Sequence, residues 1–221
     1  MWYNITMKFL WCDTETLGIN PVSSFPFQVG MIFENRLDGD SENYYKEFQF
    51  DPFDIPHAVL EEESTLAHGF SESEIRSFPI KSAEAVNRLK NSLENMVKFG
   101  DGSKPYFVAY NTFFDFKQMQ RLFSYHGVNI NLYFENMLDV YKQAKLARER
   151  GVLPSEIFNH YVDKDGVDKY SIKLVDLARH LNVEHTDAHN ALSDIKATQA
   201  ISLYLESKGV SILDTAWKKF F

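Results

Sequence analysis

The sequence predicts an α/β fold built on a mixed β-sheet. Strand-like apolar runs come first along the chain, and helical and strand-like segments alternate after them. The 221 residues, 44% hydrophobic and 15% aromatic, are enough for a sizeable core. We expect one domain over residues 1–221, with an insertion at 151–170 and a tail at 208–221.

Three strands are expected first. MKFLWCD (7–13) is an apolar run typical of a buried strand, and FPFQVGMIFEN (25–35) and ENYYKEFQFD (42–51) follow as β-rich runs. RLDGDS, around Gly39, indicates a turn between the second and third strands. Strands that follow one another in this way favour antiparallel neighbours.

Helices and strands then alternate. PYFVAYN (105–111) predicts a buried strand, and ENMLDVYKQAKLARERG (135–151) predicts an extended piece that passes into a basic helix. DKDGVDK (163–169) indicates a loop or hairpin. Apolar spacing and closing glycines predict the other helices, which fall within residues 56–70, 77–100, 113–127, 171–183 and 187–209.

Composition excludes several classes of protein. The net charge of −8 is not that of a protein that reads DNA sequence through a basic surface. The sequence holds no apolar run near the ~20 residues that span a bilayer, and the N-terminal apolar stretch, broken by Lys8, lacks a clear cleavage site. The lone Cys12 cannot form an internal disulfide, so we expect a cytoplasmic protein without membrane contact.

Acidic residues stand where strands end or helices begin. Asp13 and Glu15 follow the first apolar run at i and i+2, so both face one side of the strand. Asp115 follows PYFVAYN, and Asp194 opens the last helix with His189 five positions before it. Strand ends and helix starts are where α/β folds build their sites.

Two interpretations of these residues stay open on spacing alone. Each acid could be ordinary surface: an exposed strand end, a helix N-terminal acid favoured by the dipole, or a helix start capped by Asp187. Converging carboxylates would instead repel one another unless Mg²⁺ or Mn²⁺ held them. Two such ions and a neutral histidine would suit hydrolysis of a phosphodiester.

Three motifs in order resemble the DEDDh family of 3′→5′ exonucleases, the DnaQ-like group with the epsilon proofreading subunit and ribonuclease T. They are DTET at Asp13 and Glu15, NTFFDF at Asp115, and HNALSD, where His189 and Asp194 have the H-x4-D spacing. LAHGF and YSIKLVDLARHLNV resemble the segments before the second and third motifs. Leu17 departs from the family, which often has threonine there.

The resemblance implies a ribonuclease H-like fold with a five-stranded mixed sheet and helices on both faces. It also implies two Mg²⁺ or Mn²⁺ ions per site, release of nucleoside 5′-monophosphates from single-stranded DNA 3′ ends, and His189 as general base. The implied metal ligands are Asp13, Glu15, Asp115 and Asp194. The implied substrate-binding residues are Thr14, Thr16, Leu17, His68, Phe70, Asn111 and Phe114.

Two alternative functions remain: an exoribonuclease that trims RNA 3′ ends, and a non-catalytic module that binds nucleic acid or a partner. A homodimer is a further expectation, because relatives that resemble ribonuclease T pair. Residues 214–221, DTAWKKFF, either dock on the domain or bind a sliding-clamp-type partner. Lys142, Lys145 and Arg148 form either a solvated helix face or a track for phosphates.

Overall fold

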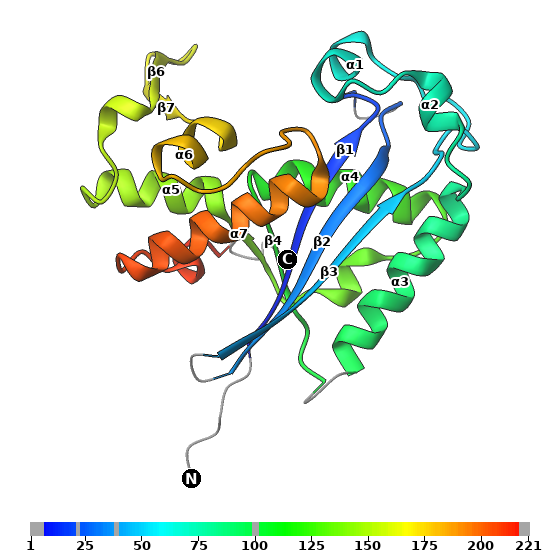
Figure 1. Cartoon of the computed structure of the whole chain (residues 1–221), viewed down its shortest axis with the longest axis horizontal. Coiled ribbons are helices and arrows are strands. Elements are labelled where there is room, and N and C mark those ends of the chain that lie inside the picture. Colours follow the sequence, from blue (N-terminus) through cyan, green and yellow to red (C-terminus); the bar gives the residue numbers. More distant parts are fainter. Residues whose placement is uncertain (1–6, 21–22, 38–39, 99–101, 217–221) are drawn as a thin grey trace.

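The computed structural model describes residues 7–20, 23–37, 40–98 and 102–216. Its central sheet has the strand order β3-β2-β1-β4-β5 (Figure 1). β1 pairs antiparallel with β2 and parallel with β4, while β2–β3 is antiparallel and β4–β5 parallel. The strands are β1 (Met7–Thr16), β2 (Pro26–Leu37), β3 (Asp40–Gln49), β4 (Tyr106–Ala109) and β5 (Met137–Asp139). The mixed sheet predicted from the sequence is therefore confirmed.

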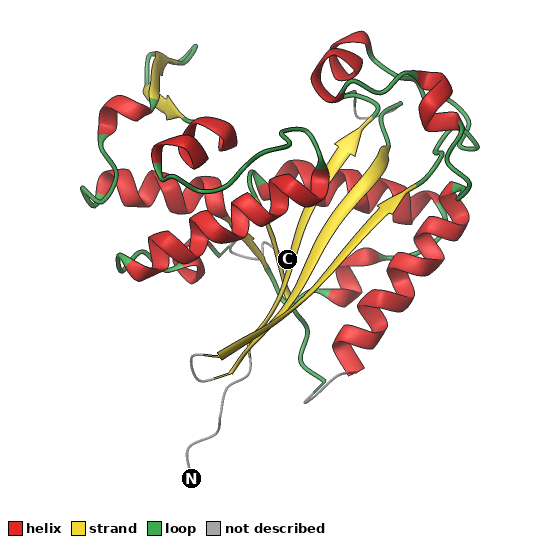
Figure 2. Cartoon of the chain, in the orientation of Figure 1, coloured by secondary structure: helices red, strands yellow, loops and turns green. Residues whose placement is uncertain are grey.

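Helices cover both faces of this sheet (Figures 1 and 2). The α-helices are α1 (Glu62–His68), α2 (Glu72–Arg76), α3 (Ser82–Lys98), α4 (Thr112–Tyr125), α5 (Val140–Glu149), α6 (Leu174–His180) and α7 (Ala191–Ser207). The 3-10 helices are η1 (Ile130–Tyr133), η2 (Ser155–Ile157) and η3 (Ile212–Thr215). Among the described helices, none combines the length and apolar character needed to cross a bilayer.

Strand alternation builds two cores. On β1, Leu10 and Cys12 face a core shared with α3 and α4, whereas Phe9 and Trp11 face one shared with α5 and α7. All four side chains are fully buried. Because successive side chains of a strand alternate between faces, the odd-numbered Asp13 and Glu15 belong to the α7 side.

A buried polar network ties α7 to the sheet. Glu34 on β2 is 1% exposed, and its carboxylate accepts from Trp11 Nε1 at 2.6 Å and Gln199 Nε2 at 3.0 Å. Arg36 forms an ion pair with Glu34 and a second one with Glu206, at 2.8 Å. Buried charges need such partners, so this network fixes where α7 lies on the sheet.

The expected elements are present, with local differences. Residues 159–171 form the antiparallel hairpin β6 (Asn159–Val162) and β7 (Asp168–Ser171), as DKDGVDK predicted. The helix expected at 171–183 is shorter, and α2, five residues long with a Ser71 capping box, was not predicted. Asp187 does not cap the last helix: Asn190 does, accepting from Ser193 N at 3.0 Å.

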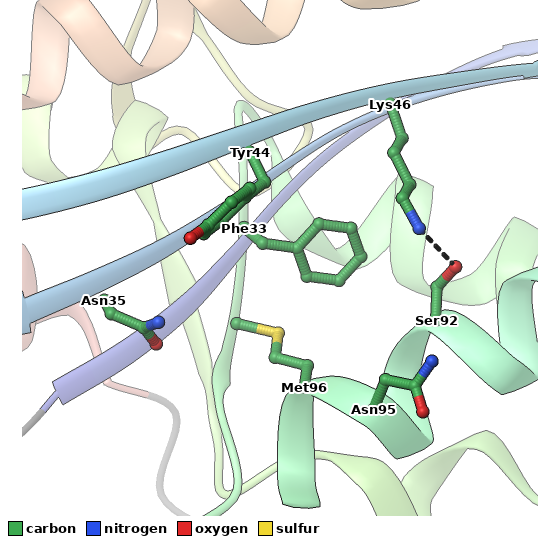
Figure 3. A pocket seen from close by; sticks show the side chains of 7 residues that line it. All are labelled: Phe33, Asn35, Tyr44, Lys46, Ser92, Asn95 and Met96. Carbon is green, nitrogen blue, oxygen red and sulfur yellow. Dashed lines mark hydrogen bonds between the residues drawn. The ribbon is translucent and has the colours of Figure 1, made fainter. Parts of the chain in front are cut away.

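A cavity of about 290 Å³ lies between α3 and the strands β2 and β3 (Figure 3). Its lining includes Phe33 and Asn35 from the second half of β2, and Lys46, which donates to Ser92 Oγ at 3.1 Å. Asn35 pairs with Lys8 near the start of β1, whereas the carboxylates stand at its end. The cavity is therefore separate from the predicted site.

Candidate metal centre

Asp13 and Glu15 stand on the last residues of β1. In the sheet they pair with Gly30 and Gln28 of β2. Glu15 is 8% exposed, and Asp13 is half-buried. Strand pairing thus fixes the backbone beneath both carboxylates, and their shared face points them to the side that α7 covers.

Asp115 comes from the first turn of α4, directly after β4. The backbone N–H and the hydroxyl of Thr14 donate to Asp115 Oδ1 at 3.0 and 2.9 Å. The hydroxyl of Thr14 thus holds Asp115, and the contact of Thr14 with a terminal nucleotide remains a prediction. Asp115 is 3% exposed, so these two hydrogen bonds satisfy a carboxylate oxygen that water does not reach.

Asp194 lies in the first turn of α7, and the chain before that helix brings two histidines to it. Asp194 Oδ1 is 2.5 Å from His185 Nε2, and Oδ2 accepts from the His189 backbone N–H at 3.3 Å. His189 is exposed and has a φ of 67°, a left-handed conformation that few non-glycine residues adopt. Such a backbone conformation is often found at functional sites.

Ligand atoms of Glu15, His189 and Asp194 lie within 4.8 Å of one another. One oxygen or nitrogen from each could therefore reach a common metal ion. The three come from β1 and from the start of α7, which are far apart in sequence. Convergence of this kind distinguishes a site from isolated surface acids, the alternative that spacing left open.

Electrostatics favours a cation at this centre. Burial, followed by Asp115, Asp194 and Glu15, raises the pKa of Asp13 well above its ordinary value. Burial and Asp194 raise the pKa of Glu15 to about 7. Burial also raises the pKa of Asp115 to about 8, against the opposing hydrogen bonds from Thr14. Carboxylates that resist ionisation together become stable anions when a cation lies among them.

The pKa of Asp194 is raised as well. Burial is the main cause, and the hydrogen bond and charge of His185 oppose it. All four predicted carboxylates thus share one electrostatic environment, and the donor set of hard oxygens with one imidazole suits a divalent ion. The residues present therefore fit the group that the resemblance implies.

The residues after Glu15 form a tight loop. Thr16 Oγ1 donates to the Gly18 carbonyl at 2.8 Å, and the fully buried Leu17 packs with Phe27 and Ile75. The resemblance implied that the Leu17 side chain would offer an apolar surface to a base. In this structure that side chain is buried and offers none. Contact with a nucleotide here would come from the backbone of the loop.

His68 and Phe70 lie beside this loop. The Phe27 ring lies 4.7 Å from the His68 ring and 5.4 Å from the Phe70 ring, between centroids. His68 Nδ1 accepts from the Phe70 N–H at 3.0 Å. Burial, followed by the charge of His189, lowers the pKa of His68. The His68 and Phe70 rings therefore pack on Phe27, which lies in one apolar cluster with Leu17.

Asn111 and Phe114 precede Asp115 where the chain passes from β4 into α4. Asn111 precedes α4 with a φ of 65° and is exposed, and its carbonyl accepts from the Phe114 N–H at 3.0 Å. Phe114 is half-buried. Both residues lie beside the end of β4, and their contact with substrate remains a prediction.

Three supporting residues were not predicted. His185 contacts Asp194, as described above. Glu61 accepts from the backbone N–H groups of Ile19 and Asn20 at 3.0 and 2.9 Å and so clamps the loop after Glu15. A Cβ on Gly30 would lie 2.4 Å from the backbone of Ala191, so only glycine lets α7 approach. Only His185 had a signal in the sequence: the stretch HTDAHN (185–190) holds a second histidine four positions before His189.

No family model matches the chain. It is 24% identical over 227 residues to the exodeoxyribonuclease I of Buchnera aphidicola, which covers 97% of this chain and 43% of that protein. E. coli exonuclease I in complex with a dA16 oligonucleotide matches at 21% identity with a TM-score of 0.67, covering 94% of this chain and 42% of that one. The zinc-ion-bound form of an E. coli ExoI–ssDNA complex matches at 19% identity with a TM-score of 0.69, also covering 94% of this chain and 42% of that one.

These comparisons confirm the resemblance that the three motifs predicted. The chain is similar to exonuclease I in sequence and in fold, and the ribonuclease H-like, five-stranded mixed sheet is confirmed. The chain spans less than half the length of these relatives.

Proposed function

We propose that this chain, which shares its fold with exonuclease I, is a metal-dependent 3′→5′ exonuclease that acts on single-stranded DNA. One observation carries the proposal: ligand atoms of Glu15, His189 and Asp194 meet within 4.8 Å, with raised pKa values at the neighbouring Asp13 and Asp115. The relatives' structures with single-stranded oligonucleotides favour DNA as the substrate.

Asp13, Glu15 and Asp194 would hold two Mg²⁺ or Mn²⁺ ions, and Asp115 would complete the set directly or through water. When bound, the ions would stabilise charge on the attacking and leaving oxygens of the phosphodiester. The ring of His189 would accept the proton of the attacking water. Its exposure lets that proton pass to solvent afterwards.

The terminal nucleotide would lie between the loop after Glu15 and the start of α4. Backbone groups of Thr16 and Leu17 would border it on one side, with His68 and Phe70 nearby. Asn111 and Phe114, at the start of α4, would border it on the other. Aromatic rings in such a place bind a base by stacking, without reading its identity. The product would be a nucleoside 5′-monophosphate.

The test is digestion of matched single-stranded DNA and RNA oligonucleotides labelled at the 5′ end, with Mg²⁺, with Mn²⁺ and with EDTA. We expect DNA to shorten stepwise from the 3′ end in Mg²⁺ or Mn²⁺ and to stay intact in EDTA. Faster cleavage of RNA would assign the alternative exoribonuclease. A folded protein that binds the oligonucleotides but cleaves neither would assign the non-catalytic module.

The homodimer and the clamp-type partner remain predictions. Of the segment 214–221, residues 217–221 lie outside the described residues. Asp214 forms an ion pair with Arg150 at 2.9 Å. The basic stripe on α5 is partly structural, because Arg148 lies 3.6 Å from the centre of the Tyr170 ring and Lys145 lies over Tyr141.

A further inference from the structure

A second histidine lies against the candidate metal centre without belonging to it. His185 Nε2 is 2.5 Å from Asp194 Oδ1, and the His185 side chain is only 5% exposed. Ligand atoms of Glu15, His189 and Asp194 meet, and His185 is not part of that group. The two histidines of HTDAHN therefore stand in different relations to the same carboxylate.

The proton on His185 follows from its surroundings. Its Nδ1 is buried and has no hydrogen-bond partner among the described residues. In a neutral ring, an N–H buried at Nδ1 without an acceptor would be more costly than an unpaired acceptor. Nε2 therefore carries a proton in the favoured neutral tautomer, as it does in the protonated ring, and donates it to Asp194.

We infer that His185 is a positioning residue that fixes the orientation of the Asp194 carboxylate for metal binding. The inference rests on the proposed function. Asp194 Oδ1 accepts from His185, and Oδ2 accepts from the His189 N–H at 3.3 Å. With both oxygens held, the carboxylate cannot rotate freely, and a ligand atom of Asp194 stays within 4.8 Å of those of Glu15 and His189. Hydrogen bonds of this kind to ligating carboxylates tune metal affinity.

The same contact holds the chain that carries His189. Asn182 and His189 both have positive φ values, 54° and 67°, although neither is glycine. A non-glycine residue in this conformation is strained and persists only where the surroundings hold it. The His185–Asp194 hydrogen bond joins this segment to the first turn of α7, so it contributes to that restraint.

The test compares His185→Gln with His185→Met. The two side chains have nearly the same shape, but only glutamine keeps a terminal N–H donor. Affinity for Mn²⁺ would be measured by titration calorimetry on the full chain. His180→Met, at an exposed position that ends α6, serves as the control for surface substitution.

We expect His185→Met to weaken Mn²⁺ binding by about 10- to 100-fold. We expect His185→Gln to stay within about 3-fold of the unaltered protein, and His180→Met to match it. Equal affinity in His185→Met and the unaltered protein would overturn the inference. Equal weakening by methionine and glutamine would overturn it too, because the loss would then follow packing rather than the donor.

Failure of the proposed function gives a different result. A chain that binds Mn²⁺, loses affinity in His185→Met, and cleaves no nucleic acid would contradict the exonuclease but keep the role of His185. If the unaltered protein cleaves DNA and His185→Met binds Mn²⁺ equally well, the exonuclease stands and the role of His185 is contradicted. A chain that binds no Mn²⁺ at all would overturn both.

Discussion

At the scale of single residues, the candidate site depends on small polar groups that hold the carboxylates. Thr14 is the clearest case, because its hydroxyl lies 2.9 Å from Asp115 Oδ1 while its backbone N–H donates to the same oxygen. Thr14 is 7% exposed, so water does not replace the hydroxyl. The threonine within DTET thus orients an acid that lies 101 residues away.

We predict that Thr14→Val lowers kcat on single-stranded DNA by about 10-fold with little change in fold, since valine keeps the shape and removes the donor. Thr198→Val is the matched control, because Thr198 is fully buried on α7 and its hydroxyl has no partner among the described residues. Steady-state kinetics of both variants check this. Equal rates in Thr14→Val and the unaltered protein would show that Asp115 needs no such support.

The raised carboxylate pKa values predict how stability depends on pH. Burial raises the pKa of Glu15 to about 7 and that of Asp115 to about 8 in the folded chain. The unfolded chain therefore loses these protons at lower pH than the folded one, so the free energy of unfolding falls as pH rises from about 5 to about 8. Bound divalent ions would oppose this fall.

We predict that the Tm of the metal-free protein falls by on the order of 5 °C between these pH values through this effect, and that Mn²⁺ restores most of it. Asp115→Asn removes one titrating group and keeps an oxygen for Thr14, so its Tm should fall less. Scanning calorimetry in EDTA and in Mn²⁺ measures both. A Tm that does not respond to Mn²⁺ at about pH 8 would contradict a metal site here.

At the scale of elements, the site forms because α7 approaches β2 very closely. Asp13 pairs with Gly30, and a Cβ on Gly30 would lie 2.4 Å from the carbonyl carbon and oxygen of Ala191. Gln28 Oε1 accepts from the Ala191 N–H at 3.3 Å. Asp194 follows one turn later, so the contact at Gly30 sets its distance from the acids on β1.

We predict that Gly30→Ala lowers kcat by at least about 10-fold, because a backbone clash at Ala191 must move the start of α7 and with it Asp194. Asn35→Ala, on the same strand but away from α7's start, is the control and should keep its activity. Kinetics and Mn²⁺ titration of the two variants give the result. Unchanged Mn²⁺ affinity in Gly30→Ala would contradict the claim that the close approach of α7 at Gly30 positions Asp194 for metal binding.

At the scale of the whole molecule, much of the fold follows from local pattern. The apolar run before Asp13 predicted β1. That run is continuous because β1 is buried on both faces: Leu10 and Cys12 face one core, and Phe9 and Trp11 face the other. Short elements such as α2 were missed. The capping box at Ser71 is a local signal, and a helix of five residues is too short to show a helical period of apolar residues.

Some residues of the candidate site could be predicted from the sequence, and others could not. Five residues, Asp13, Glu15, Asp115, His189 and Asp194, could be chosen because they stand in three motifs that resemble the exonuclease family in order, whereas spacing alone left them open. His185 and Glu61 could not be assigned a role from the sequence, since each acts on a group brought near only by folding. Leu17 was expected at the terminal base, but its contacts with Phe27 and Ile75 bury it, and no local pattern encodes that.

The central claim is that His189 and the converging carboxylates remove nucleotides from a 3′ end. The most direct measurement is single-turnover digestion of 5′-labelled single-stranded DNA by the unaltered protein, by His189→Ala and by the exposed-site control His180→Ala. We predict a ladder that shortens from the 3′ end, slowed about 10²- to 10⁴-fold in His189→Ala and unchanged in His180→Ala. Equal rates in His189→Ala and the unaltered protein, or removal from the 5′ end, would contradict the claim.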